Sequence, residues 1–165
     1  SVRVSIAWSG AEPIEDTDTL VLTIDGYSLD LRVFVDGPDR GSIDWSTVAH
    51  VKEVEGSTAK NPILRWDHII DSRPPTDLPD QGIFETLSNE DVTETGTMYN
   101  PKTTLYEPYV ETWRRLPQAT GVPYLVLRLD KSSLVHGRAG VAFLGRVGPH
   151  ALGIAKTDDG RFYAW

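Results

Sequence analysis

Carboxylates and aromatic side chains alternate in the segment ETGTMYNPKTTLYEPYVETW, which runs from Glu94 to Trp113. The segment is typical of a β-hairpin, because a turn sequence, Asn-Pro-Lys-Thr, separates its two arms. Side chains two residues apart share one face of a strand, so Glu107 and Glu111 are expected beside Tyr109 and Trp113. If that face is interior, burial raises the pKa of the carboxyl groups and suits a general acid. If it is exterior, the carboxylates are solvated charges beside an aromatic patch, and the sequence leaves both interpretations open.

Two histidines and one arginine are further candidates for catalysis. His50 and His68 lie on predicted strands, and imidazole changes charge near neutral pH, which suits an acid or a base. A structural histidine is the alternative in each case. Arg128 interrupts the apolar run YLVLRLD, so it is expected to hold an oxygen of a ligand or to pair with Glu94 or Glu111. The candidate catalytic residues are therefore His50, His68, Glu94 and Arg128.

Aromatic residues supply candidates for the walls of a pocket. The chain has five tryptophans and six tyrosines, whose rings pack while a polar N–H or O–H group faces a ligand. Ordinary core and rim positions are the alternative interpretation. The candidate substrate-binding residues are Trp45, Trp66, Tyr99, Tyr109 and Trp113. Not all of the candidates can point inward, because neighbouring positions on a strand face opposite sides.

The composition and the missing motifs exclude several classes of function, cofactor and partner. The sequence contains no GxGxxG, Walker, GxSxG or HExxH motif, no cysteine and no pair of histidines at metal-ligand spacing. We therefore expect no cofactor and no metal. The net charge of -8 disfavours nucleic acid, and no apolar run approaches the roughly 20 residues of a membrane span. An apolar or aromatic small molecule is the expected partner, and the lack of cysteine fits a cytoplasmic protein.

In the segments that position these residues, apolar and polar side chains alternate with a period of two, which is typical of β-strands. Asp25-Gly26 predicts a two-residue hairpin turn, since both of its positions require positive φ. Besides the second arm of the hairpin described above, strands are predicted at 2–8, 19–24, 27–35, 43–54, 63–70, 82–87, 92–99 (the first arm), 124–130, 139–147, 151–156 and 161–165. The pattern shows no long helix, only a single helical turn near 131–135. It therefore predicts one all-β domain over residues 1–165, an antiparallel barrel of about 8–10 strands or a sandwich, and the many aromatic residues favour the barrel.

Two further features bear on the ends of such a barrel. The segment DSRPPTDLPDQ (71–81) holds three prolines and reads either as a flap over the barrel mouth or as a stiff surface connection. Arg146 ends an apolar strand and is a candidate to close the bottom of the barrel by packing on Trp8.

Several motifs resemble a known family. They are the Glu-Thr-Gly at 94–96, the Tyr99 that precedes a turn, the Trp113, the segment TDTLVLTIDGYSLDLRVF (17–34) and the Gly-Arg pair at 145–146. On these motifs the chain resembles the fungal HRI family, named for a yeast protein that interacts with a casein kinase. The resemblance implies a lipocalin- or calycin-like β-barrel. It also implies two kinds of function: the founding yeast members look like interaction proteins with no assigned reaction, and some small relatives resemble hetero-Diels–Alderases of tropolone sesquiterpenoid biosynthesis. The resemblance supplies no catalytic motif that carries over residue by residue.

Together, these observations favour a cofactor-independent natural-product cyclase. It would join a tropolone or quinone-methide diene to the olefin of a terpene such as humulene, with a side chain assisting a preceding loss of water. The alternatives are a ligand carrier without catalysis and a protein-interaction module. A hollow interior with a few polar groups distinguishes the first two functions from the third, because an interaction module needs no cavity.

Overall fold

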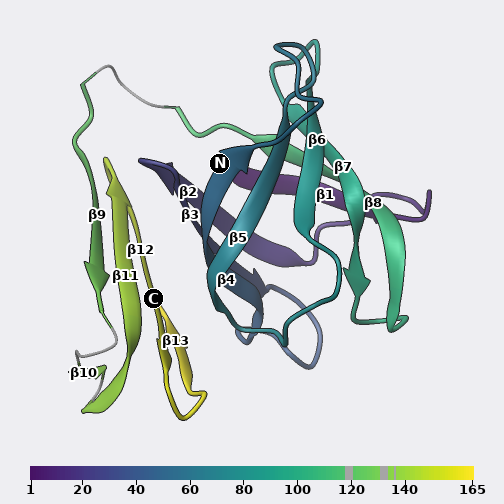
Figure 1. Ribbon diagram of the computed structural model, residues 1–165. Helices are drawn as coiled ribbons and strands as arrows, with labels where there is room; N and C mark the ends of the chain where they lie inside the picture. The colour runs from purple at the N-terminus through teal and green to yellow at the C-terminus, as the bar shows by residue number, and fades with distance from the viewer. Residues whose placement is uncertain (118–120, 131–133, 136) are drawn as a thin grey trace.

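The computed structural model of the protein describes residues 1–117, 121–130, 134–135 and 137–165 (Figure 1). The helical turn expected near 131–135 falls largely outside this part, because 131–133 are not described and 134–135 form a short strand. Within the described ranges every regular element is a strand. The strands are β1 (Val2–Trp8), β2 (Thr17–Ile24), β3 (Tyr27–Phe34), β4 (Ile43–Glu53), β5 (Ile63–Asp71), β6 (Asp80–Thr86), β7 (Val92–Asn100), β8 (Leu105–Arg114), β9 (Tyr124–Leu129), β10 (Leu134–Val135), β11 (Arg138–Val147), β12 (His150–Thr157) and β13 (Phe162–Ala164).

Strands β1 to β8 form a closed antiparallel barrel, which confirms the predicted fold class. The first hairpin turn lies where the sequence places it, since Asp25 and Gly26 both have positive φ between β2 and β3. The second lies one residue later than predicted: Asn100 ends β7, and residues 101–104 join β7 to β8. The seam between β1 and β2 is the weakest part of the wall, because their register contains a single pair, Val2 with Leu20. A bulge between Arg3 and Ser5 also bends β1 along its pairing with β8.

Strands β9 to β13 lie outside the barrel as a second antiparallel sheet. Strand β11 pairs with β9, β10 and β12, and β12 pairs with β13. Figure 1 shows this sheet, coloured green to yellow, beside the barrel wall formed by β2 to β5. The sheet therefore covers one side of the barrel and adds no residue to its interior wall.

The main hydrophobic core lies between the barrel wall and the second sheet. On the wall, Leu22 and Leu29 are buried and face outward, and on the sheet Phe143 and Ile154 pack against them. Alternation along β2 and β3 turns the intervening residues to the barrel interior, among them Val21, Thr23, Ser28, Asp30 and Arg32. The apolar face of these strands is thus used outside the barrel, and the inner face carries polar and charged groups.

We expect Leu29→Ala to lower the free energy of unfolding by about 2–5 kcal/mol, because Leu29 is fully buried between the two layers. Leu127→Ala is the control, since Leu127 is 55% exposed on β9 and its removal should change the free energy by less than about 0.5 kcal/mol. Urea unfolding followed by circular dichroism measures both values. Equal losses in the two variants would show that the core is elsewhere.

Candidate functional site

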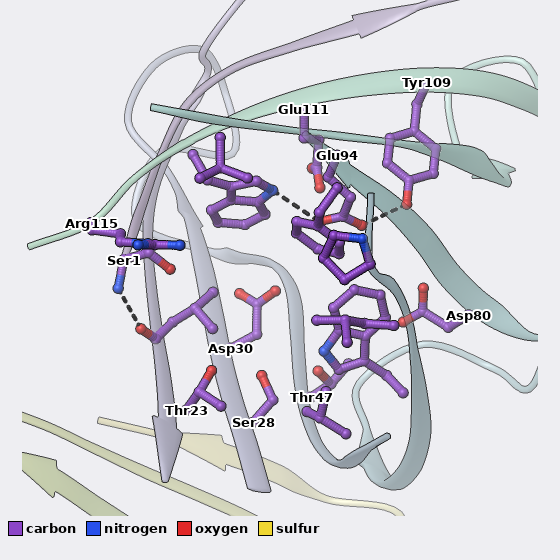
Figure 2. A pocket seen from close by; sticks show the side chains of 18 of the residues that line it. Ser1, Thr23, Ser28, Asp30, Thr47, Asp80, Glu94, Tyr109, Glu111 and Arg115 are labelled. Atoms are coloured by element: carbon purple, nitrogen blue, oxygen red, sulfur yellow. Dashed lines mark hydrogen bonds between the residues drawn. The ribbon is translucent and has the colours of Figure 1, made fainter. Parts of the chain in front are cut away.

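The barrel encloses a cavity of about 450 Å³ (Figure 2). Part of its wall is apolar, with Val21, Val51, Leu64, Trp66 and Phe84 among the lining residues. The rest of the wall is polar, and it consists chiefly of Ser28, Asp30, Arg32, Thr47, Glu94, Tyr109, Glu111 and Trp113. The interior of the barrel is therefore hollow and partly apolar, with several hydrogen-bonding groups facing it.

A buried ion network forms one side of this cavity. Glu111 on β8 is 1% exposed, and its Oε1 accepts hydrogen bonds from Arg3 Nη1 at 2.7 Å and from Arg32 Nη1 at 2.6 Å. Arg32 also donates to Asp30 Oδ2 through Nε at 3.0 Å and Nη2 at 2.9 Å. Arg3 continues the network to Glu15 on the loop before β2. Charges in a protein interior are tolerated only when they are paired in this way, so the network fixes the positions of its members.

Glu94 lies directly opposite Glu111 in the register of β7 and β8. Tyr109 Oη donates to Glu94 Oε1 at 2.7 Å, and Trp113 Nε1 donates to Glu94 Oε2 at 2.9 Å. Burial, and next the negative charge of Glu111, raises the pKa of Glu94 to about 8. Glu94 therefore carries a proton at neutral pH, whereas Glu111 is committed to two guanidinium groups.

Two glycines make room for this carboxyl group and its phenol partner. Gly82 on β6 and Gly96 on β7 face each other in the register. A Cβ atom on Gly82 would lie 2.6 Å from Glu94 Cγ, and one on Gly96 would lie 2.9 Å from Tyr109 Oη. The absence of side chains at these two positions is therefore required for Glu94 and Tyr109 to lie as they do.

A second pocket of about 390 Å³ lies under the proline-rich loop between β5 and β6. Pro74, Pro75, Leu78 and Pro79 of the loop line it together with Tyr99, Tyr106 and His68. A hydrogen bond from the Asp77 amide to Tyr106 Oη, at 3.1 Å, ties the loop to the start of β8. This placement agrees with a flap over one mouth of the barrel.

His68 is held between two carboxylates in this second pocket. Its Nδ1 lies 2.7 Å from Asp71 Oδ2, and its Nε2 lies 2.8 Å from Asp80 Oδ2. Burial lowers the pKa of the imidazole, but the hydrogen bonds and charges of the two carboxylates outweigh it and raise the pKa to about 9. His68 is therefore charged at neutral pH, and both of its nitrogens are already bonded. This geometry favours a role in holding the base of the loop.

Trp45 lies between the two pockets and lines both of them. The guanidinium carbon of Arg32 lies 4.8 Å from its ring centroid, and that of Arg73 lies 4.7 Å away. Its Nε1 donates to Asp71 Oδ1 at 2.8 Å, so the ring is held on several sides. Asp80 and Met98 also line both pockets, so these three side chains lie between the two spaces.

The structure brings five of the predicted site residues into the barrel cavity: Trp45, Trp66, Glu94, Tyr109 and Trp113. Two others, His68 and Tyr99, line the second pocket.

Two candidate catalytic residues lie away from both pockets. His50 is one position out of phase with Thr47 and Val51, so it is exposed outside the barrel, where its ring lies 4.4 Å from that of Tyr27. Arg128 belongs to β9 in the second sheet and pairs with Asp130 at 2.9 Å.

The two arginines of the second sheet cannot make the barrel contacts considered from the sequence. The partners of Glu111 are arginines of β1 and β3, so Arg128 pairs neither with it nor with Glu94. Arg146 donates to the Gly148 carbonyl at 2.8 Å instead of packing on Trp8. The reason is the same for both: the strands that carry them lie outside the barrel.

The sequence pattern did not single out Arg3, Asp30 and Arg32 as site residues. A signal for them exists in YSLDLRVF, where Asp30 and Arg32 alternate with leucines, and in VRV, where Arg3 stands between two valines. Opposite charges two residues apart on an otherwise apolar strand indicate a paired polar face. Because both faces of such a strand are buried here, the pattern alone does not tell which one lines the cavity.

The part of the chain that the structure describes lacks two other kinds of feature. No three His, Cys, Asp or Glu side chains in the described ranges are placed to hold a metal ion. Among the same residues there is no helix with the length and hydropathy needed to cross a membrane.

Comparisons with known proteins agree with the barrel fold. The chain resembles, in structure, an uncharacterized protein of Saccharomyces cerevisiae, YLR301w, with a TM-score of 0.75, at 16% sequence identity, over 96% of this chain and 74% of that chain. At this identity the likeness shows the fold alone. No curated protein matches the sequence. The family model described as Protein HRI1 matches residues 1–164. The chain therefore belongs to the HRI1 family.

Proposed function

We propose that this protein is a cofactor-independent cyclase that binds its substrates in the barrel cavity. More specifically, it is a hetero-Diels–Alderase that joins a tropolone or quinone-methide diene to a terpene olefin. Glu94 assists the preceding loss of water, which forms the diene. The observation that carries the proposal is the buried carboxyl group of Glu94, which lines the cavity and has a pKa raised to about 8.

Glu94 is suited to the acid step. The hydrogen bonds that it makes among the described residues are the two that it accepts, from Tyr109 and Trp113. Its own proton is therefore available to a molecule in the cavity. Glu94 gives this proton to the hydroxyl group that leaves, the C–O bond breaks and water departs. The ring hydroxyl of the substrate loses its proton as it becomes a carbonyl, and that proton restores Glu94, so the step balances.

The cycloaddition that follows needs positioning more than covalent chemistry. Holding two partners in a reactive pose can lower the activation barrier by about 7–11 kcal/mol. A cavity of about 450 Å³ lies within the range of roughly 300–1,000 Å³ that is typical of small-molecule pockets. Its apolar side fits a terpene, and the proton of Glu94 can donate a hydrogen bond to the carbonyl of the diene, which lowers the barrier further.

The direct test is product formation. The protein is incubated with a hydroxymethyl tropolone and humulene, and the adduct is measured by liquid chromatography and mass spectrometry. We expect adduct formation above the uncatalysed rate, and a loss of about 10²-fold or more in kcat/KM for Glu94→Gln, since a general acid contributes about 10²–10⁴. Glutamine retains the shape, because its oxygen can accept from Trp113 and its amide can donate to the Tyr109 oxygen.

The control for that experiment is Glu107→Gln. Glu107 lies on the same strand as Tyr109, bonds to Asn100 at 2.7 Å and does not line the cavity, so its replacement should leave the rate unchanged. Binding of both substrates by the wild-type protein without any acceleration would contradict the cyclase proposal and would favour a carrier.

The pH profile tests the identity of the acid. Since the active form of Glu94 is protonated and its pKa is about 8, kcat/KM should be constant below this pH and should fall about tenfold per unit above it. The residual activity of Glu94→Gln should lack this fall. A wild-type profile that rises through the same range would mean that the ionised form acts, as a base.

A third experiment needs no substrate. The folded pKa of Glu94, about 8, is above its usual value of 4.5, so the folded state binds the extra proton between these limits. The stabilisation is complete below about pH 4.5 and is lost as the pH rises to about 8, by up to about 1.4 kcal/mol per unit. Urea unfolding of the wild type and of Glu94→Gln across this range should differ by that slope. Parallel curves would show that Glu94 is ionised in the folded protein.

A further inference from the structure

The strand pairing of the barrel is interrupted beside the second pocket. The pairing of β6 with β5 ends at Trp66 and Asp80, and its pairing with β7 ends at Gly82 and Gly96. Strands β5 and β7 both continue beyond these pairs, to the proline-rich loop and to the turn between β7 and β8. The second pocket is lined by this loop and by those ends of β5 and β7. It therefore lies at the side of the barrel, where two wall strands have no strand between them.

Three side chains, those of Trp45, Asp80 and Met98, separate the second pocket from the barrel cavity. Two of them are held in place: Trp45 donates to Asp71 at 2.8 Å, and Asp80 lies 2.8 Å from His68 Nε2. Methionine is unbranched, with several rotatable bonds, and adapts its shape easily. Met98 is therefore the side chain of the three that can move aside and connect the two spaces.

The charges in the second pocket are matched within the protein. Four charged side chains line it, two of each sign: His68, Arg73, Asp71 and Asp80. His68 lies between the two carboxylates, and Arg73 Nη2 pairs with Asp44 Oδ1 at 2.7 Å. Each of these lining charges thus has a partner of opposite sign, and the rest of the wall is mainly proline and aromatic rings. Such a pocket suits a neutral, apolar molecule.

The opposite end of the barrel has a different character. Lys60, on the loop between β4 and β5, and Arg115, directly after β8, line the cavity there, together with the Ser1 ammonium group. The loop that carries Lys60 and the proline-rich loop flank β5, so they lie at opposite ends of the barrel. Figure 2 shows Arg115 and Asp80 on opposite sides of the cavity. Positive groups suit a molecule with an oxygen function, whereas a hydrocarbon cannot replace their hydration.

We propose that the second pocket is the entry site for the hydrocarbon substrate. A neutral terpene olefin lodges briefly beneath the proline-rich loop and then passes Met98 into the barrel cavity. The oxygen-bearing partner enters at the other end, past Lys60 and Arg115. This inference rests on the proposed function insofar as the hydrocarbon is one of two substrates that meet in the cavity.

The test blocks the second pocket with a removable group. The chain has no cysteine, so a single introduced cysteine can be labelled selectively. Thr97 lines the second pocket and is exposed. In Thr97→Cys, benzyl methanethiosulfonate attaches a benzylthio group to the new thiol through a disulfide bond. Dithiothreitol removes this group, so the same protein sample serves in the blocked and the open form.

The rates of association and dissociation of humulene are measured by stopped-flow fluorescence of the cavity tryptophans, Trp66 and Trp113. We expect the label to slow association by about tenfold or more, because it obstructs the route to the cavity. Dissociation should slow by the same factor and the Kd should stay unchanged, because the route is not part of the final binding site. The rates for hydroxymethyl tropolone should not change, and dithiothreitol should restore those for humulene.

Thr95→Cys is the matched control. Thr95 lies two residues before Thr97 on the same face of β7 and is also exposed, but it lines neither pocket. Its labelling should leave both rates unchanged. Met98→Ala tests the connection itself: a shorter side chain should raise both rates for humulene, and unchanged rates would overturn the role of Met98.

The outcomes separate the two proposals. Unchanged humulene rates in labelled Thr97→Cys overturn the entry route and leave the cyclase proposal standing. A weaker Kd with an unchanged association rate would make the second pocket the final binding site, which also overturns the entry role. Equal slowing of both substrates overturns the separation of their routes. Failure of humulene to bind the wild-type protein contradicts both proposals.

Discussion

The shared carboxylate of Glu111 is the interaction on which the cavity depends. It joins Arg3 of β1, Arg32 of β3 and its own strand β8 at the side of the barrel where β1 and β2 are joined by a single register pair. Two guanidinium groups on one carboxylate hold these strands together where backbone pairing is sparse. The same pairing gives Glu111 a fixed role, so that the carboxyl group opposite, Glu94, faces a negative neighbour, is buried and keeps its proton.

The polar interior is possible because the apolar core is elsewhere. A barrel of this size that buried its leucines inside would fill its own lumen. Here the second sheet covers the outer faces of β2 to β5, and Leu22, Leu29 and Ile70 pack against it. Burial of apolar surface therefore stabilises the wall from outside, and the inner face is free to carry charged groups and an open volume.

The alternation of side chains predicts most of the strands and the two tight hairpin turns, because period and turn chemistry are local properties. It makes Glu94, Tyr109 and Trp113 candidates for a pocket wall, but it leaves open which face of the hairpin is interior. It does not predict that His50 faces outward, because alternation tells which residues share a face of β4 but not which face is turned to the cavity. In the middle of the strand, residues 46–49 are buried on both faces. Nor does it place Arg128 outside the barrel, because that depends on the pairing of β9 with β11, which no local pattern specifies.

Two carboxyl groups in one cavity take different chemical roles through their surroundings. Glu94 receives two donors from neutral groups and faces a like charge, so it is protonated and can donate. Asp30 accepts two hydrogen bonds from the Arg32 guanidinium group on Oδ2, and its Oδ1 is buried with no hydrogen-bond partner among the described residues. Burial also raises the pKa of Asp30, but the charge and hydrogen bonds of Arg32 oppose that shift. The two carboxyl groups therefore differ because their partners differ: neutral donors and a like charge surround Glu94, and a guanidinium group lies beside Asp30.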